Sequence, residues 1–363
     1  MTNGYGDTLT PKTSVSGKFL DNLPNLFVSV TEQFPSSLQA AGYTVLYCIT
    51  MAAALTGNFL LISIIKRRPD TRSITGFLFV NMAVADLLVT SFVMPVSIAW
   101  LYTGGKWLPG ILGHITCTLV YFLFYVTLAA SFLSLTLMSV DRYLAVIFPL
   151  RRFPRFRRPK LLAVVVWLSS MVFSIPAAVV WRLEEYKPLR IFICTPQLER
   201  LGTFSMKGYY IYLVLIMYLI PLSVISSLYV LVGRSLWRRN VPGVVSTETE
   251  KRNKKTKVIV VRMLAIITAA FVLCWLPAHC YHLILAFRPD IHLASPSYVM
   301  FLCFWSGHAN SAVNPWLYIM LNDKFRKVLW RVFSRARSGT SHTSAEGNLV
   351  SRLIADPIRE TKV

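Results

Sequence analysis

The sequence predicts an all-α membrane protein, a seven-transmembrane helix bundle. Of its 363 residues, 55% are hydrophobic and only 15% are charged, whereas about a quarter of the residues of a soluble domain carry a charge. The hydrophobic residues are also clustered, in segments that reach or exceed the roughly 20 residues that a helix needs to cross a bilayer. There are seven such segments: 43–65, 75–101, 115–147, 161–181, 208–236, 256–286 and 297–320.

The basic residues predict the orientation of this bundle. If the amino terminus is outside and the connections alternate, 29 of the 38 Lys and Arg residues lie on the cytoplasmic side and 9 lie outside, as the positive-inside rule requires. We therefore expect an extracellular tail over 1–41, the bundle over 42–321 and a cytoplasmic disordered tail over 334–363, in a multi-pass plasma-membrane protein. This topology and the anionic lipid of the inner leaflet account for the net charge of +22, so no nucleic-acid partner is expected.

The first four segments each carry a distinctive polar or aromatic residue. The first contains Asn58, and the second has Asp86 as its only charge. The third begins near Cys117 and ends in Asp141 and Arg142, at its cytoplasmic end, and the fourth contains Trp167. Charged residues in such segments are costly unless they are paired or functional, so they mark candidate sites.

The last three segments each contain a proline. Pro221, Pro277 and Pro315 each remove a backbone hydrogen bond and favour a kink. Kinks suit a protein that switches conformation, although transporters and channels contain them as well. Trp275 and Phe271 precede Pro277 in the run FVLCWLPAH. Taken singly, these aromatic residues are most simply interpreted as core packing.

Four polar residues of the second, third and seventh segments lie at compatible depths and predict an ion site. Carboxylate, hydroxyl and amide oxygens suit a hard cation, and sodium is the best candidate in a bundle in contact with the outer medium. The alternative is a cluster of hydrogen-bonded residues and waters that only joins the helices. The four residues are Asp86, Ser131, Asn310 and Asn314.

Two of the six cysteines lie at or beyond the predicted outer surface. Cys117 opens the third segment, and Cys194 lies in the longest outer loop, 182–207. The outer compartment permits a disulfide between them, which we expect although the sequence does not establish the connectivity. Zinc binding is disfavoured because no second Cys or His stands at ligand spacing. The other four lie inside segments, as small buried apolar residues do: Cys48, Cys274, Cys280 and Cys303.

Taken in order, one set in each segment, these motifs resemble the rhodopsin-like (class A) G-protein-coupled receptors over about residues 42–333. Singly, a DRY or NPxxY match is weak, but the ordered set is specific. The motifs are GN with Asn58, VNMAVAD with Asp86, Cys117 with Cys194, DRY at 141–143, Trp167, Pro221 with Tyr229, CWLP at 274–277 and NPWLY at 314–318.

The resemblance implies an activation pathway and a heterotrimeric G protein as partner. Arg142 would pair with Asp141 at rest and turn toward Tyr229 on activation, and Leu150 would insert into the G-protein α subunit. Trp275 and Phe271 would convert ligand contact into outward movement of the sixth helix. The residues to which the resemblance gives a part in activation are Asp141, Arg142, Tyr143, Leu150, Tyr229, Phe271, Trp275, Pro277, Asn314, Pro315 and Tyr318.

The resemblance also implies a short amphipathic eighth helix over 322–333, on the inner leaflet. Its apolar face would contain Phe325, Val328, Leu329 and Val332, as an interfacial helix requires. The four candidate ligands, Asp86 among them, match the sodium site of the family. No cofactor is expected apart from this allosteric sodium ion.

The ligand pocket is predicted by position and side-chain chemistry. Phe124 lies about five helical turns before Arg142 on one face, where amine receptors of the family carry an Asp, so an amine ligand is disfavoured. Aromatic residues with polar tips suit a peptide, and Glu184 and Glu185 would attract its basic end or simply form a solvated acidic loop. Their run, LEEYKPLRIFIC, alternates like a β-hairpin. The predicted pocket contains Trp100, Tyr121, Phe124, Tyr125, His279, His282, His308, Glu184 and Glu185.

The whole is similar to receptors of the neuropeptide Y, neuropeptide FF and tachykinin type, which makes a neuropeptide receptor the expected function. A class A receptor for an amine or lipid, or a ligand-independent orphan, is the alternative. An ion pump would need a chain of carboxylates, but Asp86 stands alone beyond Asp141. An enzyme is not expected, since no hydrolase motif or metal cluster is present.

The carboxyl-terminal tail suggests regulatory partners. Phosphorylation of its hydroxyl residues would add negative charge that arrestin could read, and the run Thr361-Lys362-Val363 fits capture by a PDZ domain. The alternative is that so short a match arose by chance. The candidate phosphorylation sites are Ser338, Thr340, Ser341, Thr343 and Ser344.

Overall fold

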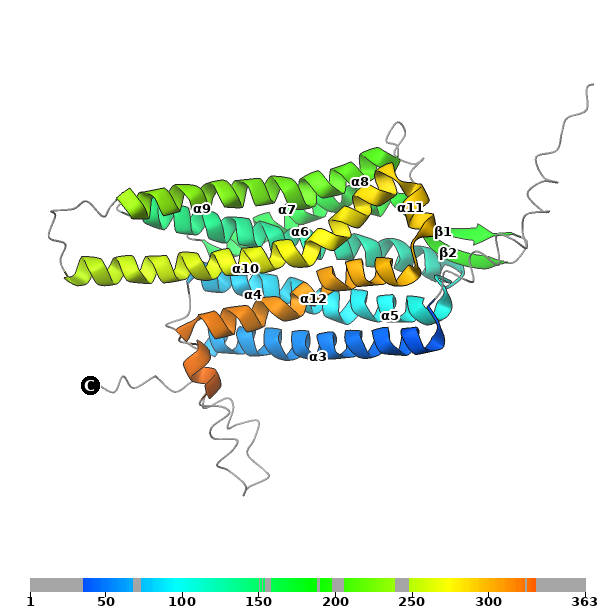
Figure 1. Ribbon diagram of the computed structural model, residues 1–363, viewed down its shortest axis with the longest axis horizontal. Coiled ribbons are helices and arrows are strands. Elements are labelled where there is room, and N and C mark those ends of the chain that lie inside the picture. Colours follow the sequence, from blue (N-terminus) through cyan, green and yellow to red (C-terminus); the bar gives the residue numbers. More distant parts are fainter. Residues whose placement is uncertain are drawn as a thin grey trace, which may run out of the picture.

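The computed structural model describes residues 35–67, 73–149, 151, 153, 158–187, 190–197, 206–238, 248–323 and 325–330. They form a bundle of seven long helical segments with a β-hairpin at one end (Figure 1). This confirms the predicted fold class. In chain order the elements are α3 (Ser37–Arg67), α4 (Ile74–Leu88), η2 (Val89–Val93), α5 (Met94–Thr103), α6 (Gly110–Ile147), α7 (Pro159–Val180), β1 (Trp181–Tyr186), β2 (Ile191–Pro196), α8 (Met206–Val214), η4 (Leu215–Leu219), α9 (Ile220–Arg238), α10 (Glu248–Phe287), α11 (Pro289–Ala294) and α12 (Ser297–Leu321).

Six of the seven segments are long and apolar enough to cross a membrane. The seventh, α12, has 25 residues but is less apolar, because the run HANSAVNP lies within it. Its polar residues are not exposed to lipid: His308, Asn310 and Asn314 are all buried in the bundle. Large apolar side chains such as Phe59 and Leu273 instead face outward, as a lipid environment favours.

Two proline-containing segments change their helical winding. The π-helical turns η2 and η4 end shortly before Pro95 and Pro221. Proline has no N–H to donate and its ring crowds the preceding turn, so one extra residue in that turn relieves the conflict. Pro176, Pro277 and Pro315 instead remain inside α7, α10 and α12.

The hairpin is attached to the bundle by a disulfide and by backbone pairing. Strands β1 and β2 are antiparallel, with Leu183 opposite Cys194, and Cys194 forms a disulfide with Cys117 of α6. Ile193 also pairs with Lys106, and the Trp107 N–H donates to the Phe192 carbonyl at 2.7 Å. The expected hairpin and disulfide are confirmed. We call this part of the bundle the hairpin end.

The fourth segment begins two residues earlier than the sequence predicted and ends one residue earlier. Helix α7 ends at Val180, and Trp181 is the first residue of β1. The Trp181 ring stacks on Tyr121 of α6, with ring centroids 3.4 Å apart. This contact and the pairing of the hairpin draw the chain away from the helix axis.

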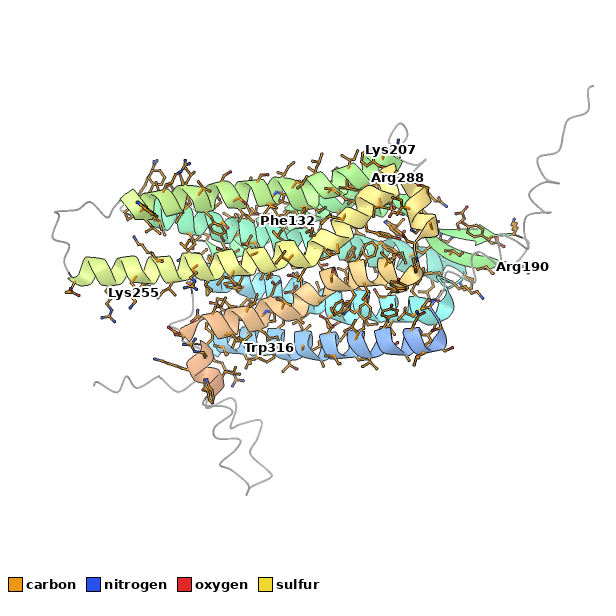
Figure 2. All side chains as sticks on the ribbon, in the orientation of Figure 1. Phe132, Arg190, Lys207, Lys255, Arg288 and Trp316 are labelled. Carbon is orange, nitrogen blue, oxygen red and sulfur yellow. A yellow bond between two sulfur atoms is a disulfide. The ribbon has the colours of Figure 1, made fainter. Side chains whose placement is uncertain are left out.

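The opposite end of the bundle, which we call the Arg142 end, carries the long extensions of α9 and α10. Lys255 lies on the α10 extension, whereas Arg190, Lys207 and Arg288 lie toward the hairpin end and Phe132 between the two (Figure 2). These charges thus lie away from the middle of the bundle.

The expected eighth helix is described only in part, because residues beyond 330, with Val332 among them, lie outside the described residues. Residues 325–330 are helical. Phe325 and Val328 are buried, and the Phe325 ring packs edge-on against Tyr318 at 4.7 Å. Leu329 is half-buried and Trp330 is exposed, so this turn is amphipathic.

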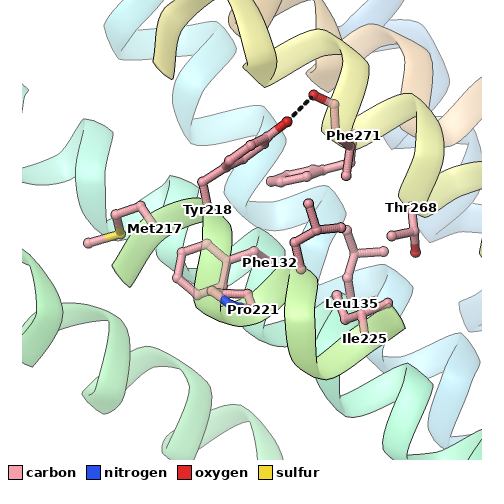
Figure 3. Close-up of a pocket in the computed structure, with 10 residues that line it drawn as sticks. Phe132, Leu135, Met217, Tyr218, Pro221, Ile225, Thr268 and Phe271 are labelled. Atoms are coloured by element: carbon pink, nitrogen blue, oxygen red, sulfur yellow. Dashed lines mark hydrogen bonds between the residues drawn. The ribbon is translucent and has the colours of Figure 1, made fainter. Parts of the chain in front are cut away.

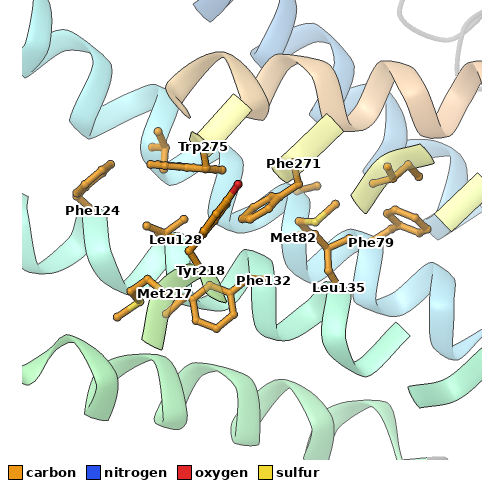
Figure 4. Packing of buried hydrophobic residues seen from close by; sticks show 14 of the residues in the cluster. Phe79, Met82, Phe124, Leu128, Phe132, Leu135, Met217, Tyr218, Phe271 and Trp275 are labelled. Carbon is orange, nitrogen blue, oxygen red and sulfur yellow. The ribbon is translucent and has the colours of Figure 1, made fainter. Parts of the chain in front are cut away.

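The core is a continuous column of apolar side chains through the middle of the bundle (Figure 4). Phe124 and Leu128 of α6 lie near Trp275 of α10, and Phe132 and Leu135 continue the column along α6. The packed column therefore runs from the predicted ligand pocket toward the Arg142 end.

Candidate functional site

Asp86 is 3% exposed and lies in a polar cluster between α4 and α12. The Ser311 hydroxyl donates to its Oδ1 at 3.0 Å, and the Asn314 amide donates to its Oδ2 at 3.5 Å. Asn58 of α3 donates to the backbone carbonyl of Ser311 at 3.0 Å. The carboxylate thus joins α4 to α12 and receives two hydrogen bonds that offset the cost of its burial, while Asn58 joins α3 to the same part of α12.

The predicted sodium ligands lie in the interior but do not all contact Asp86. Ser131 and Asn310 are buried, whereas Ser311, outside the predicted set, bonds the carboxylate directly. Within the described residues, the side-chain oxygens of Asn58, Asn310 and Asn314 are buried without a hydrogen-bond partner. Amide oxygens and a carboxylate are the kinds of donor that a hard cation prefers, so the chemistry of the residues present fits a sodium ion.

Asn81 joins a second polar group on the neighbouring faces of α4, α6 and α7. The Trp167 indole N–H donates to its Oδ1 at 2.8 Å, and its amide donates to the Ser134 hydroxyl at 2.9 Å. Both amide functions of a buried Asn are therefore used. Trp167, which the sequence identified as a motif residue, fixes the contact of the fourth segment with the second.

At the Arg142 end, three side chains form what we call the latch cluster: Thr75, Asp141 and Arg142. Arg142 forms an ion pair with Asp141 and donates to the Thr75 hydroxyl at 2.8 Å. Thr75 in turn donates to Asp141 Oδ2 at 3.0 Å. The side chains of Arg142 and Asp141 are 24% and 16% exposed, so water reaches the pair at the rim of the bundle.

Two tyrosines of the predicted activation set, Tyr229 and Tyr318, make contacts between helical segments. The Tyr229 hydroxyl accepts from Ser139 of α6 at 3.1 Å and lies 3.4 Å from Thr268 of α10. The Tyr318 ring packs on Phe79 at a centroid distance of 3.8 Å.

Two further activation candidates flank this region. Tyr143 packs edge-on against Phe148, and Pro315 lies against Gly57, where a Cβ would meet its ring at 2.8 Å. Leu150 lies outside the described residues. The structure therefore places Tyr143 and Pro315 in contacts of the bundle and leaves the position of Leu150 a prediction.

Trp275 lies at the centre of the aromatic column. Its ring centroid is 5.9 Å from that of Phe124, 6.3 Å from that of Phe271 and 6.3 Å from that of His279. Pro277 follows Trp275 by two residues in the same helix. The two aromatic residues that the sequence singled out are thus adjacent in the core.

A small apolar cavity adjoins Phe271 between the third, fifth and sixth segments (Figure 3). Pro221 and Phe132 lie on its wall, and Tyr218 closes one side by donating to the Val272 carbonyl at 3.0 Å. Space next to a large ring lowers the steric barrier to its movement.

Three buried histidines line the predicted ligand pocket. His279 packs against Tyr218, with centroids 4.6 Å apart, and His282 packs against Tyr210 at 5.4 Å. Both ring nitrogens of His279 and Nδ1 of His282 lack a partner within the described residues. Buried polar atoms that lack a partner favour a ligand that supplies hydrogen bonds.

The third histidine, His308, contacts Tyr47 and Phe124. His308 Nδ1 lies 3.1 Å from the Tyr47 hydroxyl, and its ring meets Phe124 edge-on at 5.5 Å. Phe124 also meets Tyr125 at 5.0 Å. Phe124, Tyr125 and the three histidines are therefore joined by a continuous set of ring contacts through Trp275.

The remaining predicted pocket residues lie nearer the hairpin end. Trp100 packs on Phe301, and Tyr121 stacks on Trp181. Glu184 and Glu185 are exposed on β1, and Glu184 accepts from Thr195 at 3.3 Å. The structure therefore places these residues in an outer layer above the histidines.

Sequence reasoning missed three residues of these sites. Ser311 lies three residues before Asn314 on one helix face, which is a signal that the sequence contains. Thr75 and Tyr210 carry no such signal, because Thr75 meets Arg142, and Tyr210 meets His282, only through the packing of different helices.

Comparison with known proteins agrees with this geometry. The sequence model described as "7 transmembrane receptor (rhodopsin family)" matches residues 57–318. The chain is 30% identical over 321 residues to the tachykinin-like peptides receptor 99D of Drosophila melanogaster, covering 85% of this chain and 61% of that receptor. It is 29% identical over 309 residues to the substance-P receptor of Rattus norvegicus and 28% over 304 residues to that of Homo sapiens, covering 83% and 84% of this chain and 72% of each receptor. It therefore spans about three fifths of the length of the Drosophila relative. The motifs, the seven helical segments and this match together show that the chain belongs to the rhodopsin family of seven-transmembrane receptors.

Proposed function

We propose that this protein is a neuropeptide receptor that converts binding of an extracellular peptide into activation of a heterotrimeric G protein. It is a signal transducer and not an enzyme. One observation carries the proposal: a single helix, α10, contains both pocket residues and Trp275. His279 and His282 belong to the proposed pocket, and Trp275 lies one helical turn before His279. Toward its other end the same helix meets Tyr229 through Thr268. Movement of α10 therefore couples the pocket to the Arg142 end.

The orientation follows from charge and redox chemistry. The hairpin end faces outward, because a disulfide is stable in the oxidising extracellular compartment. The Arg142 end faces the cytoplasm, where the excess of Lys and Arg belongs. Multi-pass insertion in the plasma membrane places the pocket outside and the latch cluster inside.

The chemistry of the pocket favours a peptide over an amine. Phe124 contributes no carboxylate, and the histidines and tyrosines offer hydrogen-bonding groups between aromatic faces. The names of the matched relatives, tachykinin-like and substance-P receptors, support the same ligand class. Glu184 and Glu185 at the rim attract a basic peptide end.

On activation the latch cluster opens. Arg142 leaves Asp141 and Thr75 and turns toward Tyr229, while the cytoplasmic half of α10 moves outward and exposes a cleft for the G protein. Leu150 contacts the α subunit there. Tyr318 rotates inward and holds the open conformation.

Arrestin, a PDZ protein and inner-leaflet lipid are further proposed partners. Ser338, Thr340, Ser341, Thr343 and Ser344, and the run Thr361-Lys362-Val363, lie outside the described residues. The proposal of these partners is based on the sequence alone.

A peptide panel tests the function. Cells that express the receptor are exposed to neuropeptides, amines and lipids, and G-protein activation is measured. We expect a response to a peptide, and we expect Arg142→Ala to abolish the response while peptide affinity stays within about threefold, since the side chain lies far from the pocket. A response only to an amine or lipid, or full coupling by Arg142→Ala, contradicts the proposal.

Sodium binding is tested separately. We propose that Na⁺ occupies the cluster of Asp86, Ser131, Asn310 and Asn314 and stabilises the resting state. Exchange of NaCl for choline chloride at constant ionic strength is then expected to raise agonist affinity in the wild type and to leave Asp86→Asn unchanged. Ser311→Ala distinguishes an ion site from a simple hydrogen-bonded cluster, because it removes the hydroxyl that bonds Asp86. If the variant still responds to Na⁺, residues other than Ser311 must bind the ion. Equal affinity of the wild type in both salts refutes the sodium site.

A further inference from the structure

Two adjacent residues of α12, Ser306 and Gly307, contact the part of α10 that holds Trp275. The Ser306 hydroxyl lies 2.9 Å from the backbone carbonyl of Cys274 and 2.8 Å from that of Cys303 on its own helix. It thus bonds α10 at the residue before Trp275. Neither Ser306 nor Gly307 belongs to a motif that the sequence singled out.

Gly307 leaves the space that the Trp275 ring occupies. A Cβ at Gly307 would lie 2.8 Å from both Cε3 and Cζ3 of the indole and 3.2 Å from its Cδ2. Such separations are shorter than van der Waals contact, so a side chain at this position requires the ring or a helix to move. Gly307 is buried in α12, where Ala is the better helix former. The glycine at this position allows the Trp275 ring to approach the backbone of α12 closely.

The ring cannot yield without disturbing its neighbours. Trp275 is 6% exposed and is surrounded by Phe124, Phe271 and His279 at the distances given above. Its indole N–H is buried without a partner within the described residues. Shape therefore determines the position of this ring, with no hydrogen bond to hold it.

The helical hydrogen bonding of α10 is interrupted beside Trp275. Pro277 has no N–H, so the Leu273 carbonyl loses its helical donor. Ser306 binds the next carbonyl, that of Cys274. The contact from α12 thus lies at the place where α10 bends most easily.

We propose that Ser306 and Gly307 are positioning residues that seat the Trp275 indole against α12 and thereby set the resting level of signalling. The inference rests on the proposed function, since it concerns the same movement of α10. A methyl group at position 307 conflicts only with the conformation in which the ring lies on α12. The methyl group therefore lowers the population of that conformation and raises the population of conformations in which Trp275 has moved away from α12.

The main test is Gly307→Ala. Ligand-independent G-protein activation, normalised to surface receptor, is expected to rise about tenfold, as overpacking of a core contact predicts. Gly42→Ala is the matched control, because a Cβ at this other helical glycine meets nothing within 4 Å. Basal activity equal to or below that of the wild type in Gly307→Ala overturns the proposal.

A variant with Trp275→Leu separates positioning from general destabilisation. With a smaller side chain at 275, Gly307→Ala is expected to add no basal activity. An equal increase in both backgrounds would show that the methyl group acts elsewhere and would overturn the proposal.

A distance measurement keeps the inference separate from the proposed function. Spin labels at Arg67→Cys and Val258→Cys, with exposed Cys48 and Cys280 replaced by serine, report the separation of α3 and α10 at the Arg142 end. In purified receptor in lipid nanodiscs, Gly307→Ala is expected to increase the fraction of longer distances, and an unchanged distribution overturns the inference. Longer distances without G-protein activation in any variant would support the inference and refute the proposed function.

Ser306→Ala provides a second variant in case Gly307→Ala does not reach the cell surface. It removes the hydroxyl that bonds Cys274 and adds no bulk. A smaller increase in basal activity and in the fraction of longer distances is expected, and wild-type values for both overturn the proposal.

Discussion

The two ends of the bundle are held together by different kinds of interaction. The hairpin end has a disulfide between Cys117 and Cys194 and backbone pairing of β1, β2 and Lys106. At the Arg142 end the interactions between segments described above are side-chain bonds: those of the latch cluster and those of Tyr229. We therefore expect the Arg142 end, and not the hairpin end, to rearrange.

The magnitudes support this difference. A disulfide contributes about 2–4 kcal/mol to stability, whereas a side-chain hydrogen bond contributes about 1 kcal/mol net. Opening the latch cluster exposes its charges to water at the rim, which offsets part of the lost bonds. The Arg142 end can therefore open at a cost of a few kcal/mol, the range in which a minor state remains populated.

Removing the disulfide should have the largest effect. Cys117→Ser is expected to lower the free energy of unfolding by about 2–4 kcal/mol, because the bridge closes a long loop of the chain. Thermal unfolding of the purified receptor, followed by its loss of peptide binding, measures this change. Cys48→Ser, at an exposed free cysteine, is the control; equal melting temperatures for the two variants would remove the distinction between the ends.

A change in the latch cluster should alter signalling more than stability. Thr75→Val removes the hydroxyl that bonds both Arg142 and Asp141. Basal G-protein activation should rise at least about fivefold, which corresponds to the about 1 kcal/mol net contribution of one of the two lost hydrogen bonds, with peptide affinity nearly unchanged. Thr56→Val is the control, since this exposed hydroxyl bonds only the carbonyl of Ala52 on its own helix. Basal activity at the wild-type level would argue against a restraining role for Thr75.

Acidification should loosen one part of the hairpin end. Burial lowers the pKa of His292 in α11 below its ordinary value of 6.5, and its Nδ1 contacts the Tyr281 hydroxyl. Because the folded pKa lies below the unfolded one, this stability is present above pH 6.5 and is lost as the pH falls through the folded pKa. Amide hydrogen exchange in α11, corrected for intrinsic rates, should accelerate on acidification in the wild type and not in His292→Gln. The same acceleration in both would exclude the histidine as its cause.

The smallest effect on stability is expected at an exposed ion pair between Arg288 and Asp290 of α11. The hydrogen bond from Arg288 lowers the pKa of Asp290, but both side chains are 62% exposed, where solvent screens their attraction. Asp290→Asn should leave the melting temperature unchanged within error at neutral pH. A decrease comparable to that of Cys117→Ser would show that the pair, and not the disulfide, secures this end.

Much of the candidate site could be predicted from the sequence, because its residues lie on one helix at fixed spacing. Trp275, Pro277 and His279 share α10, and their relation follows from helical geometry. The positive-inside asymmetry likewise predicted an orientation. Contacts between helices were less predictable: Ser131 and Asn310 were expected with Asp86, and the bond found there comes from Ser311.

The sequence alone was sufficient for the seven segments, the hairpin and the order of the motifs. These depend on hydrophobic length, alternation and spacing, which are local properties of the chain. Only the tertiary structure decided that Thr75 bonds Arg142, that Ser311 faces Asp86 and that Gly307 admits the Trp275 ring. Each of these depends on the rotation of one helix against another, which is set by side-chain packing across the whole bundle and leaves no mark on the spacing within a single helix.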